Sequence, residues 1–235
     1  MITKWNFQTP TEEELHKRDK LASDLGISPF VCLLLVQRGL STVEEVKKFF
    51  KPSLNDLHDP FLMPDMEKAV KRLNKALGNK EKILIYGDYD VDGTTAVSLV
   101  YKYLRPYSSS LDYYIPDRYD EGYGISYKGI DYARENGITL VISLDCGIKA
   151  IEKIEYAKQF GIDFIICDHH MPDDILPNAV AVLDAKRVDS VYPYEHLSGC
   201  GVGFKFMQAF AKSNNFPFAD LEKLLELTAV SIASD

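Results

Sequence analysis

The sequence contains no long hydrophobic run. Its longest uninterrupted apolar stretch, from Phe30 to Val36, is far shorter than the roughly 20 residues that a helix needs to cross a bilayer. The first ten residues include Lys4 and Pro10 and lack the apolar centre of a secretory signal. We therefore expect a cytoplasmic protein that has no membrane partner.

Cysteine is also scarce, and the 27 basic residues are outnumbered by 35 acidic ones. The 4 cysteines stand singly, with no C-x-x-C spacing, so we expect reduced thiols in or near the core instead of disulfides or a zinc site. The net charge of −8 argues against broad, non-specific binding of nucleic acid. A local site remains open, because bound divalent cations can dominate the field around them. The cysteines are Cys32, Cys146, Cys167 and Cys200.

The first eighty residues are predicted to form a helical lead-in. Acidic turns at 11–14 and 42–46 are typical of helix starts. Apolar residues recur at helical spacing over 66–77, whereas 52–64 contains proline and aspartate and is predicted to be irregular.

From residue 81 onward, short apolar runs alternate with helical stretches. This alternation predicts an α/β fold with a doubly wound, mainly parallel five-stranded sheet. In such sheets ligands bind beyond the carboxyl ends of the strands. The predicted strands are 83–86, 111–115, 140–144, 164–167 and 179–183, and the predicted helices are 95–104, 126–135, 150–160 and 203–212.

Three aspartates alternate directly after the first predicted strand, at Asp88, Asp90 and Asp92. Carboxylates at this spacing repel one another, so they either have raised pKa values or hold a divalent cation. Asp145 follows another predicted strand. If it lies on the same edge of the sheet as the three aspartates, its carboxylate could bridge two cations. Considered alone, it is equally well explained as a turn residue.

Two other phosphate- or calcium-linked motifs share part of this pattern. An EF-hand loop counted from Asp88 would require glutamate at its twelfth position, which is Leu99 here. Asp90 to Thr94 matches the haloacid-dehalogenase motif, in which the first aspartate is a covalent nucleophile, but that hypothesis leaves the later histidines unexplained. A solvated acidic loop is the plainest alternative.

A second motif, Asp168-His169-His170, follows the strand at 164–167. A single histidine beside a strand is usually a packed core residue. For two in succession we expect one imidazole to bind metal while the acid orients it, and the other to face a phosphate. Adding imidazole to oxygen ligands shifts the metal preference from magnesium or calcium toward manganese.

Two loops are candidates for binding substrate. Arg118 and Tyr123 lie among aromatic residues and glycines after a strand, where a guanidinium could hold phosphate and a ring could stack on a base. An ordinary surface loop is the alternative. A second loop is a glycine-rich turn that leads into a helix. Its spacing fits backbone contact with a nucleic-acid phosphate better than it fits binding of a dinucleotide cofactor. Its candidate residues are Ser198, Gly199, Gly201 and Lys205.

Together, the segments 87–93, 168–170 and 198–201 with Asp145 resemble the motifs of the DHH phosphoesterase superfamily, and within it the RecJ family. Segments 57–62 and 117–124 also resemble RecJ more than the members that act on small substrates. RecJ proteins are single-strand-specific exonucleases that work from the 5′ end in DNA repair and recombination, with manganese or magnesium.

The resemblance implies a helical lead-in over 1–80 and a DHH catalytic domain over 81–235. It also implies that the chain is an N-terminal catalytic fragment, without the DHHA1-like and OB-like domains that follow in RecJ. Single-stranded DNA is the implied substrate, and a single-strand-binding protein and a helicase are the implied partners.

The resemblance further implies two divalent cations, Mn²⁺ or Mg²⁺. Asp90 and Asp145 would hold one, assisted by Asp88. His170, next to Asp168, would contact the scissile phosphate. The other cation would be held by Asp92, Asp145, His169 and Asp235.

Two other functions remain as alternatives to an exonuclease. One is a phosphodiesterase or pyrophosphatase of the same superfamily that acts on small substrates. The other is a nucleic-acid-binding module without catalytic activity.

Overall fold

The computed structural model describes residues 9–235, which divide into two compact units, one up to Leu57 and one from His58 onward. The first unit contains helices α1 (Glu12–Leu25), α2 (Pro29–Gln37) and α3 (Val43–Phe50), followed by a short 3₁₀ turn (Leu54–Asp56). Thr11 and Thr42 form capping boxes at the starts of α1 and α3, as their acidic first turns predict.

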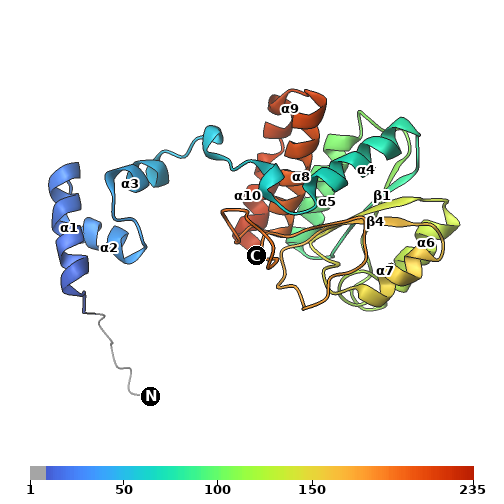
Figure 1. Cartoon of the computed structure of the whole chain (residues 1–235), viewed down its shortest axis with the longest axis horizontal. Helices are drawn as coiled ribbons and strands as arrows, with labels where there is room; N and C mark the ends of the chain where they lie inside the picture. Colours follow the sequence, from blue (N-terminus) through green and yellow to red (C-terminus); the bar gives the residue numbers. More distant parts are fainter. Residues whose placement is uncertain (1–8) are drawn as a thin grey trace, which may run out of the picture. The chain divides into compact units, whose positions relative to one another are not determined.

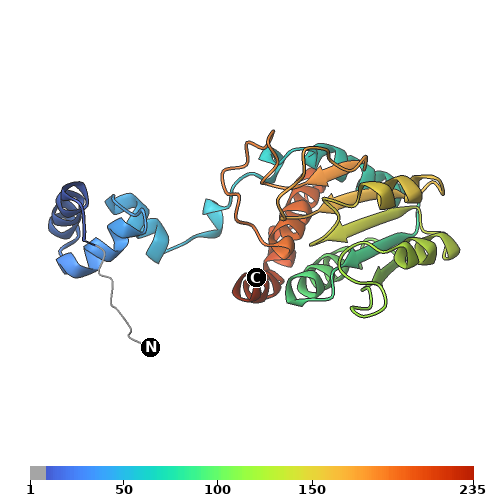
Figure 2. The same cartoon turned by 90° about the horizontal axis from the view of Figure 1, so that it is seen from below.

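The second unit is built on a five-stranded sheet in the order β2-β1-β3-β4-β5, with every pair parallel (Figures 1 and 2). The predicted α/β fold with a parallel sheet is therefore confirmed. The chain first moves from β1 to one side of the sheet and then returns to the other, so the order reverses between β1 and β3. The strands are β1 (Ile83–Gly87), β2 (Leu111–Tyr114), β3 (Leu140–Leu144), β4 (Asp163–Cys167) and β5 (Ala181–Leu183).

Helices cover both faces of the sheet (Figure 1). On one face, α6 (Tyr127–Glu135) and α7 (Ile151–Lys158) pack over a core that includes Leu84, Tyr86 and Val141. On the other face, α5 contacts both α8 and α10, and α4 contacts α8 and β5. This burial on both faces explains why every residue of β1 and β3 is buried and why nearly all of them are apolar. The helices of this second layer are α4 (Met66–Gly78), α5 (Val91–Leu104), α8 (Gly199–Asn214), α9 (Phe218–Glu222) and α10 (Leu225–Ser234).

Two helices begin four residues earlier than apolar periodicity predicts. α5 starts at Val91 and α8 at Gly199, because Asp90 and Ser198 act as N-caps. The first turns of both helices contain glycine and few apolar residues, so apolar periodicity does not reveal them. As a result, Asp92 lies in the first turn of a helix and not in a loop.

Other differences are smaller. The segment 52–64 contains two 3₁₀ turns, the second at Pro60–Leu62, and β5 begins at Ala181. α4 belongs to the second compact unit, because it packs on α8 and β5. The four cysteines are free and buried, which confirms the prediction for them. Over residues 9–235, no helix combines the length and apolarity that a membrane span requires.

Candidate metal centre

An aspartate directly follows each of four neighbouring strands. Gly87, Leu144, Cys167 and Leu183, which end β1, β3, β4 and β5, are paired across the sheet. The residues that come next are therefore brought together at the carboxyl edge, and all four are at least 98% buried. Three of them were predicted from the sequence; the fourth was not, although it carries the same strand-end pattern. They are Asp88, Asp145, Asp168 and Asp184.

The three aspartates after β1 lie in different environments. Asp88 is buried, accepts a hydrogen bond from the Gly124 amide at 3.2 Å, and leaves its Oδ2 without a partner. Burial raises the pKa of Asp88. Asp90 is exposed and caps α5 by accepting the Gly93 amide at 2.9 Å. Asp92 is buried inside the domain.

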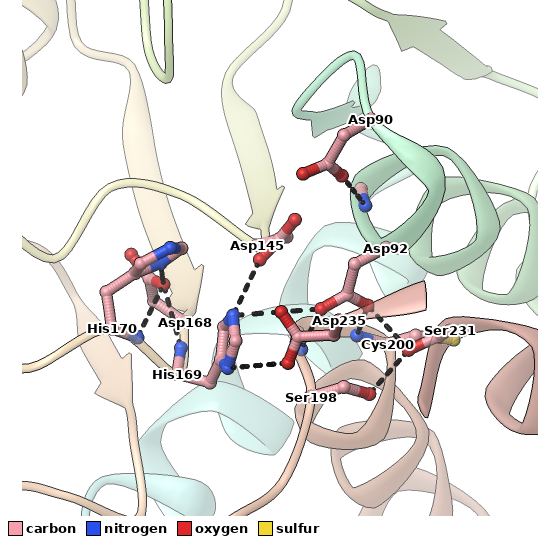
Figure 3. A network of polar contacts seen from close by, with 12 residues as sticks. Asp90, Asp92, Asp145, Asp168, His169, His170, Ser198, Cys200, Ser231 and Asp235 are labelled. Atoms are coloured by element: carbon pink, nitrogen blue, oxygen red, sulfur yellow. Dashed lines mark hydrogen bonds and ion pairs between the residues drawn. The ribbon is translucent and has the colours of Figure 1, made fainter. Parts of the chain in front are cut away.

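Asp92 is held by the start of α8 (Figure 3). Its Oδ2 accepts the Gly199 amide at 2.6 Å, and its Oδ1 accepts the Cys200 amide at 2.8 Å and the Ser231 hydroxyl at 2.7 Å. These three hydrogen bonds hold both oxygens of the Asp92 side chain in place at the start of a helix. The Gly201 amide donates to Ser198. The glycine-rich turn thus directs these amides at acceptors within the protein.

Gly199 permits a close approach between α8 and β3. A Cβ atom at this position would lie 2.5 Å from Asp145 Cβ and 2.6 Å from Asp145 Oδ1. No other residue type fits there without displacing Asp145, so the glycine positions two carboxylates at once.

His169 lies among three carboxylates (Figure 3). Its Nε2 is 3.1 Å from Asp145 Oδ1 and 3.7 Å from Asp92 Oδ2, and its Nδ1 is 3.6 Å from Asp235 Oδ2. Burial by itself would lower the pKa of His169, but the carboxylates outweigh burial and raise it to about 9.

Asp145 sits in the left-handed region, at φ 60°, which is unusual for a residue other than glycine and is typical of functional sites. Its contact with His169 has the distance of an ion pair but not the alignment of a hydrogen bond, so the buried Oδ1 has no hydrogen-bond partner. Burial raises the pKa of Asp145 to about 7.

Asp168 orients His170. Its Oδ1 accepts the amides of His169 and His170 and lies 2.7 Å from His170 Nδ1, and its Oδ2 accepts the Ile148 amide. Although burial opposes it, this set of hydrogen bonds lowers the pKa of Asp168. The Tyr123 hydroxyl lies 2.9 Å from His170 Nε2. The hydrogen bond to Asp168 raises the pKa of His170.

The side chains at this edge fit a divalent cation. Ligand atoms of Asp145, His169 and His170 lie within 4.8 Å of one another, and so do those of Asp92, His169 and Asp235. A buried carboxylate oxygen without a donor, beside an imidazole and further carboxylates, is a suitable donor set for manganese or magnesium. Asp88 and Asp90 belong to neither group, and Figure 3 shows Asp90 at the start of α5, apart from the His169 ring.

The predicted substrate-binding residues divide into two groups. Arg118 lies over the Tyr89 ring at 5.2 Å, and Tyr89 meets Tyr123 edge to face, so these residues extend from His170 along the rim of the site. Lys205 is not part of this edge. It is buried in α8 and donates to the His58 carbonyl at 2.7 Å, and burial lowers its pKa to about 8.

Ser231, which was not predicted from the sequence, joins α10 to Asp92 through one hydrogen bond. Its hydroxyl lies 2.5 Å from the Ser198 hydroxyl. A lone serine in a helix gives no local signal for this role.

Comparison with known proteins gives consistent results. The model of the DHH family, N-terminal domain, matches residues 82–232. The chain is 38% identical over 232 residues to the single-stranded-DNA-specific exonuclease RecJ of Bacillus subtilis and 31% identical over 220 residues to that of Escherichia coli. These matches cover 99% and 89% of this chain but only 28% and 37% of the two relatives.

Two solved structures share the fold. A crystal structure of exonuclease RecJ bound to manganese aligns with a TM-score of 0.66 at 27% identity, over 73% of this chain and 43% of that one. RecJ from Thermus thermophilus in complex with Mn²⁺ aligns with a TM-score of 0.74 at 23% identity, over 92% of this chain and 30% of that one. Since the family model covers more than half of the sequence, the chain belongs to the DHH family.

Proposed function

We propose that this chain is the catalytic domain of a metal-dependent exonuclease that hydrolyses phosphodiester bonds of single-stranded DNA. The observation that carries the proposal is the position of His169, buried between Asp92, Asp145 and Asp235 beside a carboxylate oxygen without a donor. The similarity to RecJ exonucleases supports the choice of substrate.

In this proposal two divalent cations, Mn²⁺ or Mg²⁺, bind at the carboxyl edge. Asp92, Asp145, His169 and Asp235 would hold one, and Asp90 and Asp145 would hold the other with help from Asp88. Bound there, such cations make water more acidic and neutralise charge on the phosphate during in-line attack.

The side chains of the protein supply orientation and proton control. The start of α8 and Ser231 fix both oxygens of Asp92, so this carboxylate needs no rearrangement before it acts. Asp168 fixes the ring of His170, which then presents a hydrogen-bond donor to the scissile phosphate.

Arg118 and Tyr123 are proposed to guide the strand. A guanidinium can hold a backbone phosphate, and exposed aromatic rings can stack on bases without regard to sequence. Cleavage from the 5′ end, a role in repair and recombination, and partnership with a single-strand-binding protein and a helicase rest on the family resemblance alone.

The test is release of nucleotides from 5′-labelled single-stranded DNA with Mn²⁺, with and without chelator. We expect Asp145→Asn to lower the rate by about 100-fold or more, because that corresponds to a few kcal/mol of lost charge stabilisation. Asp131→Asn, in the middle of α6 and away from the site, is the matched control and should keep full activity.

Unchanged cleavage by Asp145→Asn would refute the proposal. Cleavage of dinucleotides or pyrophosphate but not of a long strand would instead identify a phosphodiesterase for small substrates. Binding of the strand without any cleavage would identify a nucleic-acid-binding module.

A further inference from the structure

The loop between β2 and α6, residues 115–126, carries Arg118 and Tyr123, the two residues proposed to guide the strand. This loop contains turns and bends but no helix or strand. Side chains on a loop are held less precisely than those on a helix or strand, unless other groups fix the loop backbone. Two side chains make hydrogen bonds of that kind here: Tyr86 in β1 and Glu121 in the loop itself.

Tyr86 holds the second half of the loop. It belongs to a buried strand, and only 1% of its surface is exposed. Its hydroxyl donates to the Gly124 carbonyl at 3.0 Å and accepts the Ser126 amide at 3.1 Å. One side chain of the sheet therefore holds two backbone groups of the loop, and both would be left buried without a partner if the hydroxyl were removed.

The Tyr86 ring is itself fixed by packing. It stacks on the Tyr114 ring of the neighbouring strand, with centroids 5.4 Å apart. Helix α6 also lies close to it, because a Cβ atom at Gly129 would be 2.6 Å from a carbon of the Tyr86 ring. Close packing of this kind leaves a side chain little freedom to change rotamer. The hydroxyl is thus presented to the loop from a fixed position.

Glu121 joins the two ends of the loop. Its carboxylate accepts the Asp117 amide at 2.9 Å and the Tyr114 hydroxyl at 3.0 Å. It also accepts the Ser126 hydroxyl, which in turn caps α6 by accepting the Gly129 amide. Hydrogen bonds to a charged acceptor are stronger than those between neutral groups. The carboxylate therefore ties the start of the loop to the start of α6.

The loop that these residues fix meets the candidate metal centre at two points. The Gly124 amide donates to Asp88 Oδ1 at 3.2 Å, so Gly124 is held by its amide at Asp88 and by its carbonyl at Tyr86. The preceding residue, Tyr123, is about half exposed, and its hydroxyl lies 2.9 Å from His170 Nε2. A shift of Gly124 would therefore move the Tyr123 ring relative to His170.

We propose that Tyr86 and Glu121 are positioning residues, which fix the loop so that Arg118 and Tyr123 are in place before the single strand arrives. The proposal rests on the proposed function for the identity of the ligand. Neither residue touches the substrate; both act through the loop backbone. A loop that is already ordered loses less conformational entropy on binding, so the two residues favour binding of the strand.

The first test is amide hydrogen exchange of Tyr86→Phe and of the wild type, measured by NMR in chelator and without DNA. The Ser126 amide loses its acceptor in the variant, so we expect it to exchange roughly tenfold faster or more, while the amides of β3 keep their rates. Tyr103→Phe is the matched control. Tyr103 is also buried, but its hydroxyl has no hydrogen-bond partner within residues 9–235, so this variant should leave the Ser126 amide unchanged.

The second test is steady-state cleavage of 5′-labelled single-stranded DNA with Mn²⁺. We expect Tyr86→Phe to raise KM about fivefold and to keep kcat within about twofold, because guiding the strand contributes equally to substrate and transition state. Partial unfolding would instead lower kcat at unchanged KM, since it removes active molecules without altering those that remain. Glu121→Gln should also raise KM, and Asp120→Asn, at its exposed neighbour, should not.

An unchanged exchange rate of the Ser126 amide in Tyr86→Phe would overturn the inference, and so would a lower kcat at unchanged KM in both variants. Absence of cleavage by the wild type would refute the nuclease proposal, whereas the exchange measurement, which needs neither metal nor DNA, would still decide whether Tyr86 fixes the loop. Wild-type cleavage with variants that match the wild type would leave the nuclease proposal standing and remove this inference.

Discussion

The Asp92 carboxylate lies 2.6 Å from the amide nitrogen of Gly199, at the start of a helix more than one hundred residues further along the chain. This contact joins the first turn of α5 to the first turn of α8. It fixes a candidate metal ligand with backbone groups, which cannot change rotamer. The orientation of the site therefore depends on the packing of two helices.

Gly199→Ala is expected to abolish Mn²⁺-dependent cleavage while leaving most of the fold intact. The added Cβ would lie 2.5 Å from Asp145 Cβ, so Asp145 or the start of α8 must move, and misplacing a catalytic group by about 1 Å can cost roughly 100-fold in rate. Cleavage rate and Mn²⁺ affinity would both be measured.

Gly201→Ala is the matched control in the same turn. Its added Cβ would lie 3.4 Å from Ser198 Oγ and 3.5 Å from Leu197, which are ordinary contact distances. Activity should be retained. An equal loss of activity in both variants would mean that glycine is needed at position 199 for flexibility of the helix start and not for the close approach to Asp145.

The sequence allowed the sheet and most of its acidic edge to be predicted, because an apolar run that ends in aspartate is a local pattern. Asp145 and Asp168 were found in this way. Asp184 shows the same pattern after the predicted strand 179–183, so the same signal would have found it. The acceptor of the Gly199 amide could not be predicted, since Asp92 is distant in sequence. Lys205 was placed in the candidate site because a glycine-rich turn does not reveal which side of its helix is buried.

Asp184→Asn is expected to stabilise the protein at neutral pH. Burial raises the pKa of Asp184 to about 6, so the folded state binds this proton more tightly than the unfolded state does. The free energy of unfolding therefore falls as the pH rises from about 4 to 6. Above that range the charged Asp184 destabilises the folded state by about 2–3 kcal/mol. Asparagine lacks the penalty and can still accept the Lys186 amide.

The measurement is urea unfolding of both proteins in chelator between pH 4 and 8. The two free energies of unfolding should agree near pH 4, and the variant should be more stable at pH 7.5. A variant that is equally destabilised at both values would show that the charged form of Asp184 is held favourably.

Arg72→Ala is expected to destabilise the fold without weakening Mn²⁺ binding. Arg72 is buried and donates to Asp163 Oδ2 at 2.6 Å and to Glu81 Oε2 at 2.7 Å, at the amino ends of the strands. Removing it leaves Glu81 without its ion pair. We expect the free energy of unfolding to fall by about 2 kcal/mol; the value is at the low end for a buried pair because Asp163 is partly exposed to solvent. Lys71→Ala, its exposed neighbour, is the control.

This loss should depend on pH. Although burial opposes it, hydrogen bonds from Thr139 and Arg72 lower the pKa of Glu81. The contribution of the pair is therefore complete above the unfolded pKa of about 4.3 and disappears as the pH falls through the folded value. Unfolding in urea at pH 7 and at pH 3 measures it; a difference between wild type and Arg72→Ala that persists at acid pH would contradict this account.

The most direct test of the metal centre is the anomalous difference density of crystals of this chain grown with Mn²⁺. We predict a peak at coordination distance from the His169 imidazole and from the carboxylates of Asp92 and Asp145, and no such peak in crystals of Asp145→Asn. Manganese bound only elsewhere, or none at saturating concentration, would contradict the account.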